Sequence, residues 1–264
     1  PEVYGDDRVF VVVGLKGEQV DEERLAALVA AGHPVLRHEL ATPHEIGGEF
    51  LRWELATVVA GAVLGINPFD QPNVQESKDN TRALLEEFAG TGELPAETGT
   101  SPAGVGGAEW AGPGGRSAYP VHDAALDAAL RDLFGRAAPG EYLAVQAFVR
   151  PDPVVWDALQ SIRAVLRDRL RVATTLGYGP RYLHSTGQYH KGGPERGLFL
   201  QVIGHDPHDV AVPGQPYSFG VLKRAQARGD LAALRTRGKP ALRVCLGDDV
   251  GAGLERLAAL VAGV

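Results

Sequence analysis

Short apolar runs alternate with longer segments of helical spacing along the chain. Residues 9–14 are mostly β-branched and end in glycine, a pattern that predicts a buried strand. Residues 21–31 begin with acidic side chains, carry leucines at helical spacing and stop at Gly32, which predicts a helix. Strands are expected at 9–14, 34–40, 142–150, 199–203 and 240–246, and helices at 21–31, 45–64, 78 to about 88, 122–136, 153–171, 219–228 and 250–261.

This alternation of strands and helices is typical of an α/β domain with a parallel sheet. The helix at 45–64 is nearly all apolar after Trp53, so we expect it to be largely buried. Residues 90–120 are dense in Gly and Pro and predict a linker or a long surface loop. The glycines there follow no predicted strand and open no helix, which argues against a dinucleotide-binding fingerprint. Trp53, Trp110 and Trp156 are expected to be core or interface aromatics.

The two halves of the chain resemble each other. Residues 24–40 align without gaps on residues 230–246, and nine of the 17 positions are identical. The matches span a predicted helix, turn and strand, and a further strand precedes each copy. Such a pattern predicts an internal duplication of an α/β unit, with convergence of two Ala/Leu-rich helices as the weaker explanation. We therefore expect two related modules, at 1–89 and 121–264, joined by the linker at 90–120.

The composition narrows the functional classes. The 264 residues are 44% hydrophobic and 22% charged, which suits a folded protein with one large or two modest domains. A net charge of -7 argues against a nucleic-acid partner. No apolar stretch is long enough for a bilayer, and no signal-peptide pattern follows Pro1. The single cysteine, Cys245, predicts a buried thiol and a reducing, cytoplasmic location. The absence of methionine favours a piece of a longer polypeptide.

The least ordinary run is at residues 65–78. Pro68 and Pro72 predict a rigid, extended loop after the long helix, and the Asn, Asp and Gln side chains beside them suit contact with a ligand. Lys78 is expected at the start of the next helix. Because a helix N-terminus favours anions, this position alone predicts only a solvated cation.

Two segments of the chain resemble phosphoglucose isomerase (glucose-6-phosphate isomerase). The signature of that family is an aromatic residue followed by Asp-Gln, then a Val, and a lysine seven residues after the Gln. The matching residues are Phe69, Asp70, Gln71, Val74 and Lys78. A second segment, residues 183–189, is similar to the stretch that carries the family's catalytic histidine, which here is His184.

The order of the two motifs is unusual, because in the family the histidine segment precedes the lysine segment. With Lys78 before His184 and an internal duplication, the chain resembles the isomerase C-terminal part of bacterial transaldolase/phosphoglucose isomerase fusions. This implies three-layer sugar-isomerase (SIS) modules with a parallel sheet. It also implies interconversion of glucose 6-phosphate and fructose 6-phosphate, a step of glycolysis and gluconeogenesis that needs neither a cofactor nor a metal.

The resemblance also implies roles for individual residues. Lys78 would help to open the sugar ring and would stabilise the developing oxyanion, as a fixed cation can. His184 would be the ring-opening acid/base, and an imidazole that titrates near neutrality suits this task. Gln71 and Ser185 would contact the substrate.

Two segments of the family have no match in the chain. One holds the glutamate that moves the proton between C2 and C1, and the other is the Ser/Thr-rich loop that binds the sugar phosphate. We therefore expect the chain alone to be a poor catalyst, completed by upstream domains of the same polypeptide or by a second subunit, as in a homodimer. The alternative is a non-catalytic sugar-phosphate-binding or assembly module.

Other candidate sites are weaker. His205 and His208 could hold a metal, but a proline between them breaks the helical spacing and favours an exposed polar loop. His184 and His190 frame a Gly-containing segment that continues to Lys191. This pattern suits an anion-binding loop and a simple surface turn about equally.

Overall fold

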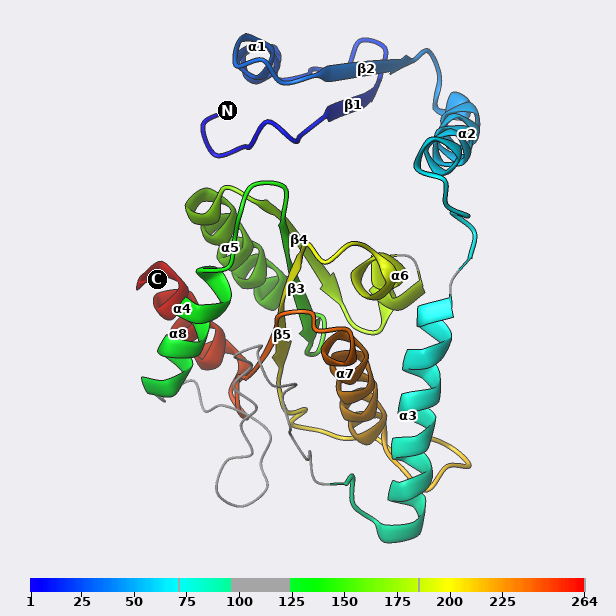
Figure 1. Cartoon of the computed structure of the whole chain (residues 1–264), viewed down its shortest axis with the longest axis vertical. Coiled ribbons are helices and arrows are strands. Elements are labelled where there is room, and N and C mark those ends of the chain that lie inside the picture. Colours follow the sequence, from blue (N-terminus) through cyan, green and yellow to red (C-terminus); the bar gives the residue numbers. More distant parts are fainter. Residues whose placement is uncertain (71, 96–123, 185, 264) are drawn as a thin grey trace. The chain divides into compact units, whose positions relative to one another are not determined.

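The computed structural model describes residues 1–70, 72–95, 124–184 and 186–263. The described chain is α/β, and its named strands pair in parallel, which confirms the α/β class and the parallel pairing that the sequence predicts. It divides into two compact units, Pro1–Asp70 and Gln71–Val264, which are described separately below. Figure 1 shows the helices and strands of both units.

The first unit is a small strand–helix–strand–helix arrangement. Its elements are β1 (Phe10–Leu15), α1 (Glu22–Ala30), β2 (Val35–Leu40), the 3-10 turn η1 (Pro43–Glu45) and α2 (Ile46–Leu64). The two strands form a parallel pair with Phe10 opposite Val35. The Asp21 side chain caps α1 by accepting a hydrogen bond from the backbone N–H of Arg24 at 2.9 Å. The β-branched run at 9–14 and the helical leucine spacing that stops at Gly32 thus predict β1 and α1 within a residue or two.

Helix α2 is largely exposed, so the prediction of a buried helix is wrong. Phe50 is 63% exposed and Val63 is 80% exposed, and the buried positions of the helix are Glu49 and Gly61. Two strands and two helices supply too little apolar surface to cover a helix that is apolar on most sides. Trp53 is likewise 43% exposed, and its indole N–H donates to the buried Glu49 carboxylate at 2.8 Å.

The second unit contains a four-stranded parallel sheet with the strand order β4-β3-β5-β6. Its elements are α3 (Pro72–Thr91), α4 (Ala124–Phe134), β3 (Tyr142–Phe148), α5 (Pro153–Leu170), β4 (Ala173–Tyr178), the 3-10 turn η2 (Arg181–His184), α6 (Thr186–Gly192), β5 (Gly197–Ile203), α7 (Phe219–Thr236), β6 (Ala241–Cys245) and α8 (Val250–Gly263). Helices α4, α5 and α8 cover one face of the sheet, and α6 and α7 lie on the other, with α3 packed along α7 (Figure 1).

The two faces of this sheet differ in chemistry. The face toward α4, α5 and α8 is a core of leucine, valine and isoleucine side chains. On the opposite face Gln146, Gln201 and Arg243 lie next to one another in register on β3, β5 and β6, and all three are buried. Buried polar groups need hydrogen-bond partners. Arg243 Nε donates to Gln201 Oε1 at 2.6 Å, so this face holds a polar layer beneath α6 and α7.

The aligned segments of the two units share backbone geometry. In the first, the Phe10 N–H donates to the Pro34 carbonyl at 2.9 Å, and in the second the Phe199 N–H donates to the Pro240 carbonyl at 2.9 Å. The glycine after the preceding helix has a positive φ in both, 87° and 65°, which a residue with a β-carbon adopts only with strain. The sequence match therefore extends to the turn and to the strand register.

Three local predictions are wrong. Pro72 is the first residue of α3, so the expected loop at 65–78 ends earlier and Lys78 lies in the second turn of the helix. Strand β4 was not expected, because its Thr-Thr-Leu-Gly sequence shows no clear alternation. The segment from His184 to Lys191 is not a loop, because most of it forms α6.

The contact pattern places α3 in the second unit, whereas a module at 1–89 would place it in the first. That module boundary stays a prediction. Most of the expected linker at 90–120 lies outside the described residues. Within the described part of the chain, no helix combines the length and the apolar character needed to cross a membrane.

Candidate functional site

The two residues with predicted catalytic roles lie in the second unit. Lys78 is exposed on α3, and His184 is the last residue of η2, two positions before the first residue of α6. Gln71 and Ser185 lie outside the described residues, so their substrate contacts stay predictions. The site can therefore be built from α3, η2, α6 and the elements that pack against them.

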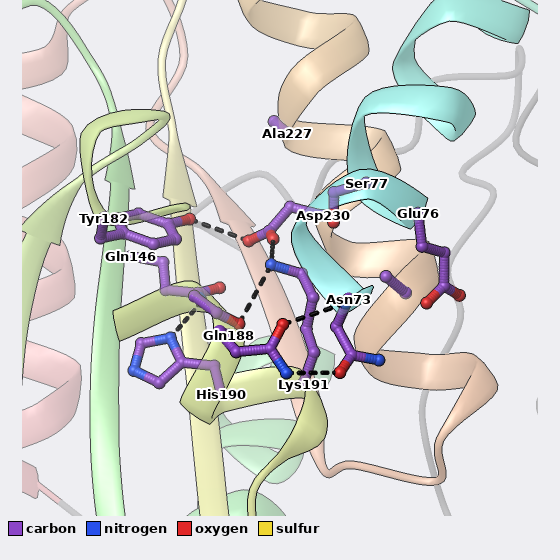
Figure 2. Close-up of polar contacts among 12 residues, drawn as sticks. Asn73, Glu76, Ser77, Gln146, Tyr182, Gln188, His190, Lys191, Ala227 and Asp230 are labelled. Atoms are coloured by element: carbon purple, nitrogen blue, oxygen red, sulfur yellow. Dashed lines mark hydrogen bonds and ion pairs between the residues drawn. The ribbon is translucent and has the colours of Figure 1, made fainter. Parts of the chain in front are cut away.

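Two side chains join the motif segments directly. At the start of α3 the backbone N–H of Asn73 donates to Gln188 Oε1 at 3.0 Å, and the side-chain amide groups of the two residues lie 2.7 Å apart (Figure 2). Asn73 precedes Lys78 by five residues, and Gln188 follows His184 by four. The fold thus brings together two motifs that are more than 100 residues apart in the sequence.

A surface ion pair holds the same end of α3 against α7. Arg237, at the end of α7, lies 2.5 Å from the Glu76 carboxylate. This hydrogen-bonded guanidinium lowers the pKa of Glu76, so the carboxylate stays ionised at neutral pH. Glu76 lies two residues before Lys78. The first turns of α3 are therefore held by α6, through Asn73, and by the end of α7, through Glu76.

A buried ion pair lies beneath α6. Lys191 Nζ is 2.5 Å from Asp230 Oδ1, and both side chains are fully buried. The Tyr182 hydroxyl donates to Asp230 Oδ2 at 2.9 Å (Figure 2). Burial and the adjacent carboxylate raise the pKa of Tyr182 well above its ordinary value, so its hydroxyl remains a donor. One carboxylate on α7 therefore binds both η2 and α6.

His190, on α6, lies in the same polar layer and contacts aromatic rings of the sheet. Its Nδ1 is 3.2 Å from Gln146 Nε2, and its ring stacks on Tyr142 and meets Phe199 edge-on. Because Gln146 donates from its Nε2, the histidine proton is assigned to Nε2. Burial, and then the Lys191 cation, lower the pKa of His190 to about 4. The imidazole is therefore neutral at physiological pH.

The stability of the chain should depend on the protonation of His190. Its pKa is about 4 when folded and 6.5 when unfolded, so the unfolded chain binds the proton more tightly between these values. Stability is therefore lost as the pH falls from about 6.5 to about 4, by about 3 kcal/mol for this group. Urea unfolding at pH 7, 5.5 and 4.5 should show a steeper loss for the wild type than for His190→Gln. Equal slopes for the two proteins would contradict this prediction.

Sequence reasoning missed the Tyr182, Asp230 and Lys191 cluster. The two predictions for the segment with His190 and Lys191, an anion-binding loop and a surface turn, are both wrong because the two side chains are buried. One signal was present: Asp230 aligns with Arg24 of the other copy, a reversal of charge within the match.

The remaining candidate residues of the sequence analysis lie outside this cluster. His205 and His208 lie in a loop after β5, and His205 Nδ1 is 2.7 Å from Asp248 Oδ1. Across the residues that the structure describes, no group of three histidine, cysteine or acidic side chains could hold a metal. Cys245 is buried, as predicted. Trp156 is half-exposed and stacks on Tyr178, so it is not a core residue.

Comparisons with known proteins give partial matches. No protein-family model matches the chain. Over 44 residues the chain is 48% identical to the glucose-6-phosphate isomerase of Exiguobacterium sibiricum, which is 17% of this chain and 10% of that protein. Over 86 residues it is 33% identical to the glucose-6-phosphate isomerase of Leptospira biflexa, which is 30% of this chain and 19% of that protein. These matches thus span at most about a fifth of the curated relatives.

Among solved structures, a hypothetical protein from Thermus thermophilus superposes with a TM-score of 0.42 and 16% identity, over 96% of this chain and 56% of that one. This likeness is too low to carry an argument. The sequence matches are more informative, although they are short. Part of this chain is similar to glucose-6-phosphate isomerase, which supports a relationship with that enzyme family.

Proposed function

We propose that the chain is the C-terminal part of a glucose-6-phosphate isomerase-type enzyme that interconverts glucose 6-phosphate and fructose 6-phosphate. The observation that carries this proposal is the contact between the motif segments, through Asn73 and Gln188. The partial identity to glucose-6-phosphate isomerases supports the same reaction class. A sugar phosphate is the proposed substrate.

In this proposal Lys78 and His184 act on the open and closed forms of the sugar. Lys78 is exposed, so its ammonium is accessible to a ligand and can stabilise the charge of an enediolate-like intermediate. His184 exchanges a proton with the ring oxygen or the anomeric hydroxyl. The remaining proton transfer, between C2 and C1, is assigned to a carboxylate from upstream domains or from a second subunit. Gln71 and Ser185 complete the proposed substrate contacts.

The same proposal extends to the origin of the fold. Shared strand register and the equivalent positive-φ glycines support two SIS-like modules that arose by duplication. The order of Lys78 and His184 supports membership of a transaldolase fusion. A single buried cysteine supports a reducing compartment such as the cytoplasm. A homodimer would supply the second subunit.

The proposal is tested with fructose 6-phosphate as the probe. A coupled assay measures formation of glucose 6-phosphate, and calorimetry measures binding, with fructose and inorganic phosphate as controls. We expect weak turnover together with binding that needs both the sugar and the phosphate. Binding without any turnover favours the alternative, a sugar-phosphate-binding module, which the unmatched glutamate segment supports. Absence of both turnover and binding would contradict both functions.

A further inference from the structure

Helix α7 packs against α3 close to Lys78. At Gly229 the approach is so close that a β-carbon would lie 2.9 Å from Thr81 Oγ1 and 3.2 Å from the backbone oxygen of Ser77. Ser77 is buried in this contact and directly precedes Lys78. Because backbone atoms of Ser77 and Thr81 lie against the glycine together with the Thr81 hydroxyl, a larger residue would displace α3. Gly229 therefore sets the position of the helix that carries Lys78.

The next residue on α7 holds the other motif. Asp230 accepts the Tyr182 hydroxyl and pairs with Lys191, and these two residues lie two positions before and seven positions after His184. Both contacts are charge-assisted and buried, so they are stronger and more rigid than a surface hydrogen bond. Asp230 therefore binds the two ends of the segment that contains His184 (Figure 2).

The other copy of the repeat differs at these two positions. Gly229 and Asp230 align with Glu23 and Arg24, which are exposed on α1, while the following leucine is buried in both copies. The two aligned segments thus carry different residues at two of the positions where α7 meets the motif segments. Compared with Glu23, Gly229 lacks a side chain, and compared with Arg24, Asp230 carries the opposite charge.

We propose that Gly229 and Asp230 form a junction that holds the α3 and η2–α6 segments in one arrangement, and that Asp230 is a positioning residue of the isomerase site. The second half of this statement rests on the proposed function, and the first half does not. Reacting groups held in a productive geometry can lose about 100-fold in rate when they are misplaced by about 1 Å. Asp230 would act through Tyr182 and Lys191 and would not touch the sugar.

The first experiment measures the arrangement without any substrate. The chain has one cysteine, which is buried, so Arg82→Cys on α3 and Thr186→Cys on α6 provide selective positions for spin labels. In the full chain, pulsed electron resonance should give one narrow distance distribution. Asp230→Asn should broaden or shift it, and Tyr182→Phe should do so to a smaller extent. Tyr178→Phe, a tyrosine outside the network, is the control and should leave it unchanged.

Folded variants with unchanged distances would overturn the junction. If Asp230→Asn does not fold, the distances in Tyr182→Phe and Tyr178→Phe test the junction instead. Loss of one hydroxyl leaves the aromatic packing in place, so these variants should fold. The distance measurement does not depend on activity. Absence of fructose 6-phosphate turnover in the wild type would therefore refute the proposed function and leave this result intact.

The second experiment tests the positioning role on fructose 6-phosphate. At a temperature where each variant is fully folded, Tyr182→Phe should lower kcat about tenfold and change KM less than threefold, because misplaced groups act mainly in the transition state. Tyr178→Phe should match the wild type in both parameters. A broadened distance with an unchanged kcat would refute the positioning role.

Discussion

Asp230→Ala is expected to lower the free energy of unfolding by about 3–5 kcal/mol. The substitution removes the carboxylate that pairs with the Lys191 ammonium, which is fully buried and cannot reach water. It also leaves the Tyr182 hydroxyl without its acceptor. Urea unfolding followed by circular dichroism at pH 7 measures the loss.

A surface ion pair is the matched control for this substitution. Asp79 pairs with Arg82 one turn along α3, and both side chains are more than half exposed. Asp79→Ala should therefore cost less than about 1 kcal/mol. Similar losses of unfolding free energy for Asp230→Ala and Asp79→Ala would show that the Asp230–Lys191 pair behaves like a surface ion pair, contrary to this prediction.

The double variant Asp230→Ala/Lys191→Met separates an orphaned charge from lost packing. Replacing both partners by apolar groups removes the uncompensated cation, so the double variant should recover at least half of the stability lost by Asp230→Ala. If the stability loss of the double variant equals the sum of the losses of Asp230→Ala and Lys191→Met, the two side chains do not interact.

The order of strands and helices was predictable from the sequence because burial imposes a period on each element. In the second unit β3, β5 and β6 are short apolar runs buried on both faces, and each was found within a few residues of its bounds. Strand β4 was missed, because it lies at the edge of the sheet, is only partly buried and so lacks such a run. The start of α3 differs from the prediction because proline, which favours a loop in most positions, is also well suited to the first position of a helix.

Burial was less predictable than element type. The apolar sequence of α2 favours a buried helix, yet cover depends on elements elsewhere, and the first unit has few of them. Conversely, Lys191 and Asp230 are charged and would be placed on the surface by any local pattern. They are buried because η2, α6 and α7 supply each with a partner, an arrangement that exists only in the folded chain.

The candidate site likewise contains residues that the sequence indicates and residues that only the fold brings together. Lys78 and His184 stand out because each belongs to a motif with fixed neighbours. The groups that hold their segments, Asn73 with Gln188 and Tyr182 with Asp230, pair residues that are 115 and 48 positions apart. Local sequence carries no information on such pairs, although the alignment of residues 24–40 with 230–246 does place Asp230 opposite Arg24, a residue of opposite charge.

Lys78→Met is expected to lower kcat/KM for fructose 6-phosphate by about 100- to 1000-fold, the usual effect of removing one group that stabilises an oxyanion. Because Lys78 is exposed, the substitution should change the free energy of unfolding by less than about 0.5 kcal/mol. The coupled isomerase assay measures the first quantity and urea unfolding the second. A large kinetic loss without a stability loss would assign the effect to the ammonium itself.

Arg82→Met is the control for Lys78→Met. Arg82 is an exposed cation one turn further along α3, so its removal changes the charge of the helix by the same amount. It should leave kcat/KM within about twofold of the wild type, because attraction of an anionic substrate by an exposed charge is weak and screened by salt. Equal losses in both variants would mean that α3 acts only through its net charge, and Lys78 would then have no specific role in the reaction.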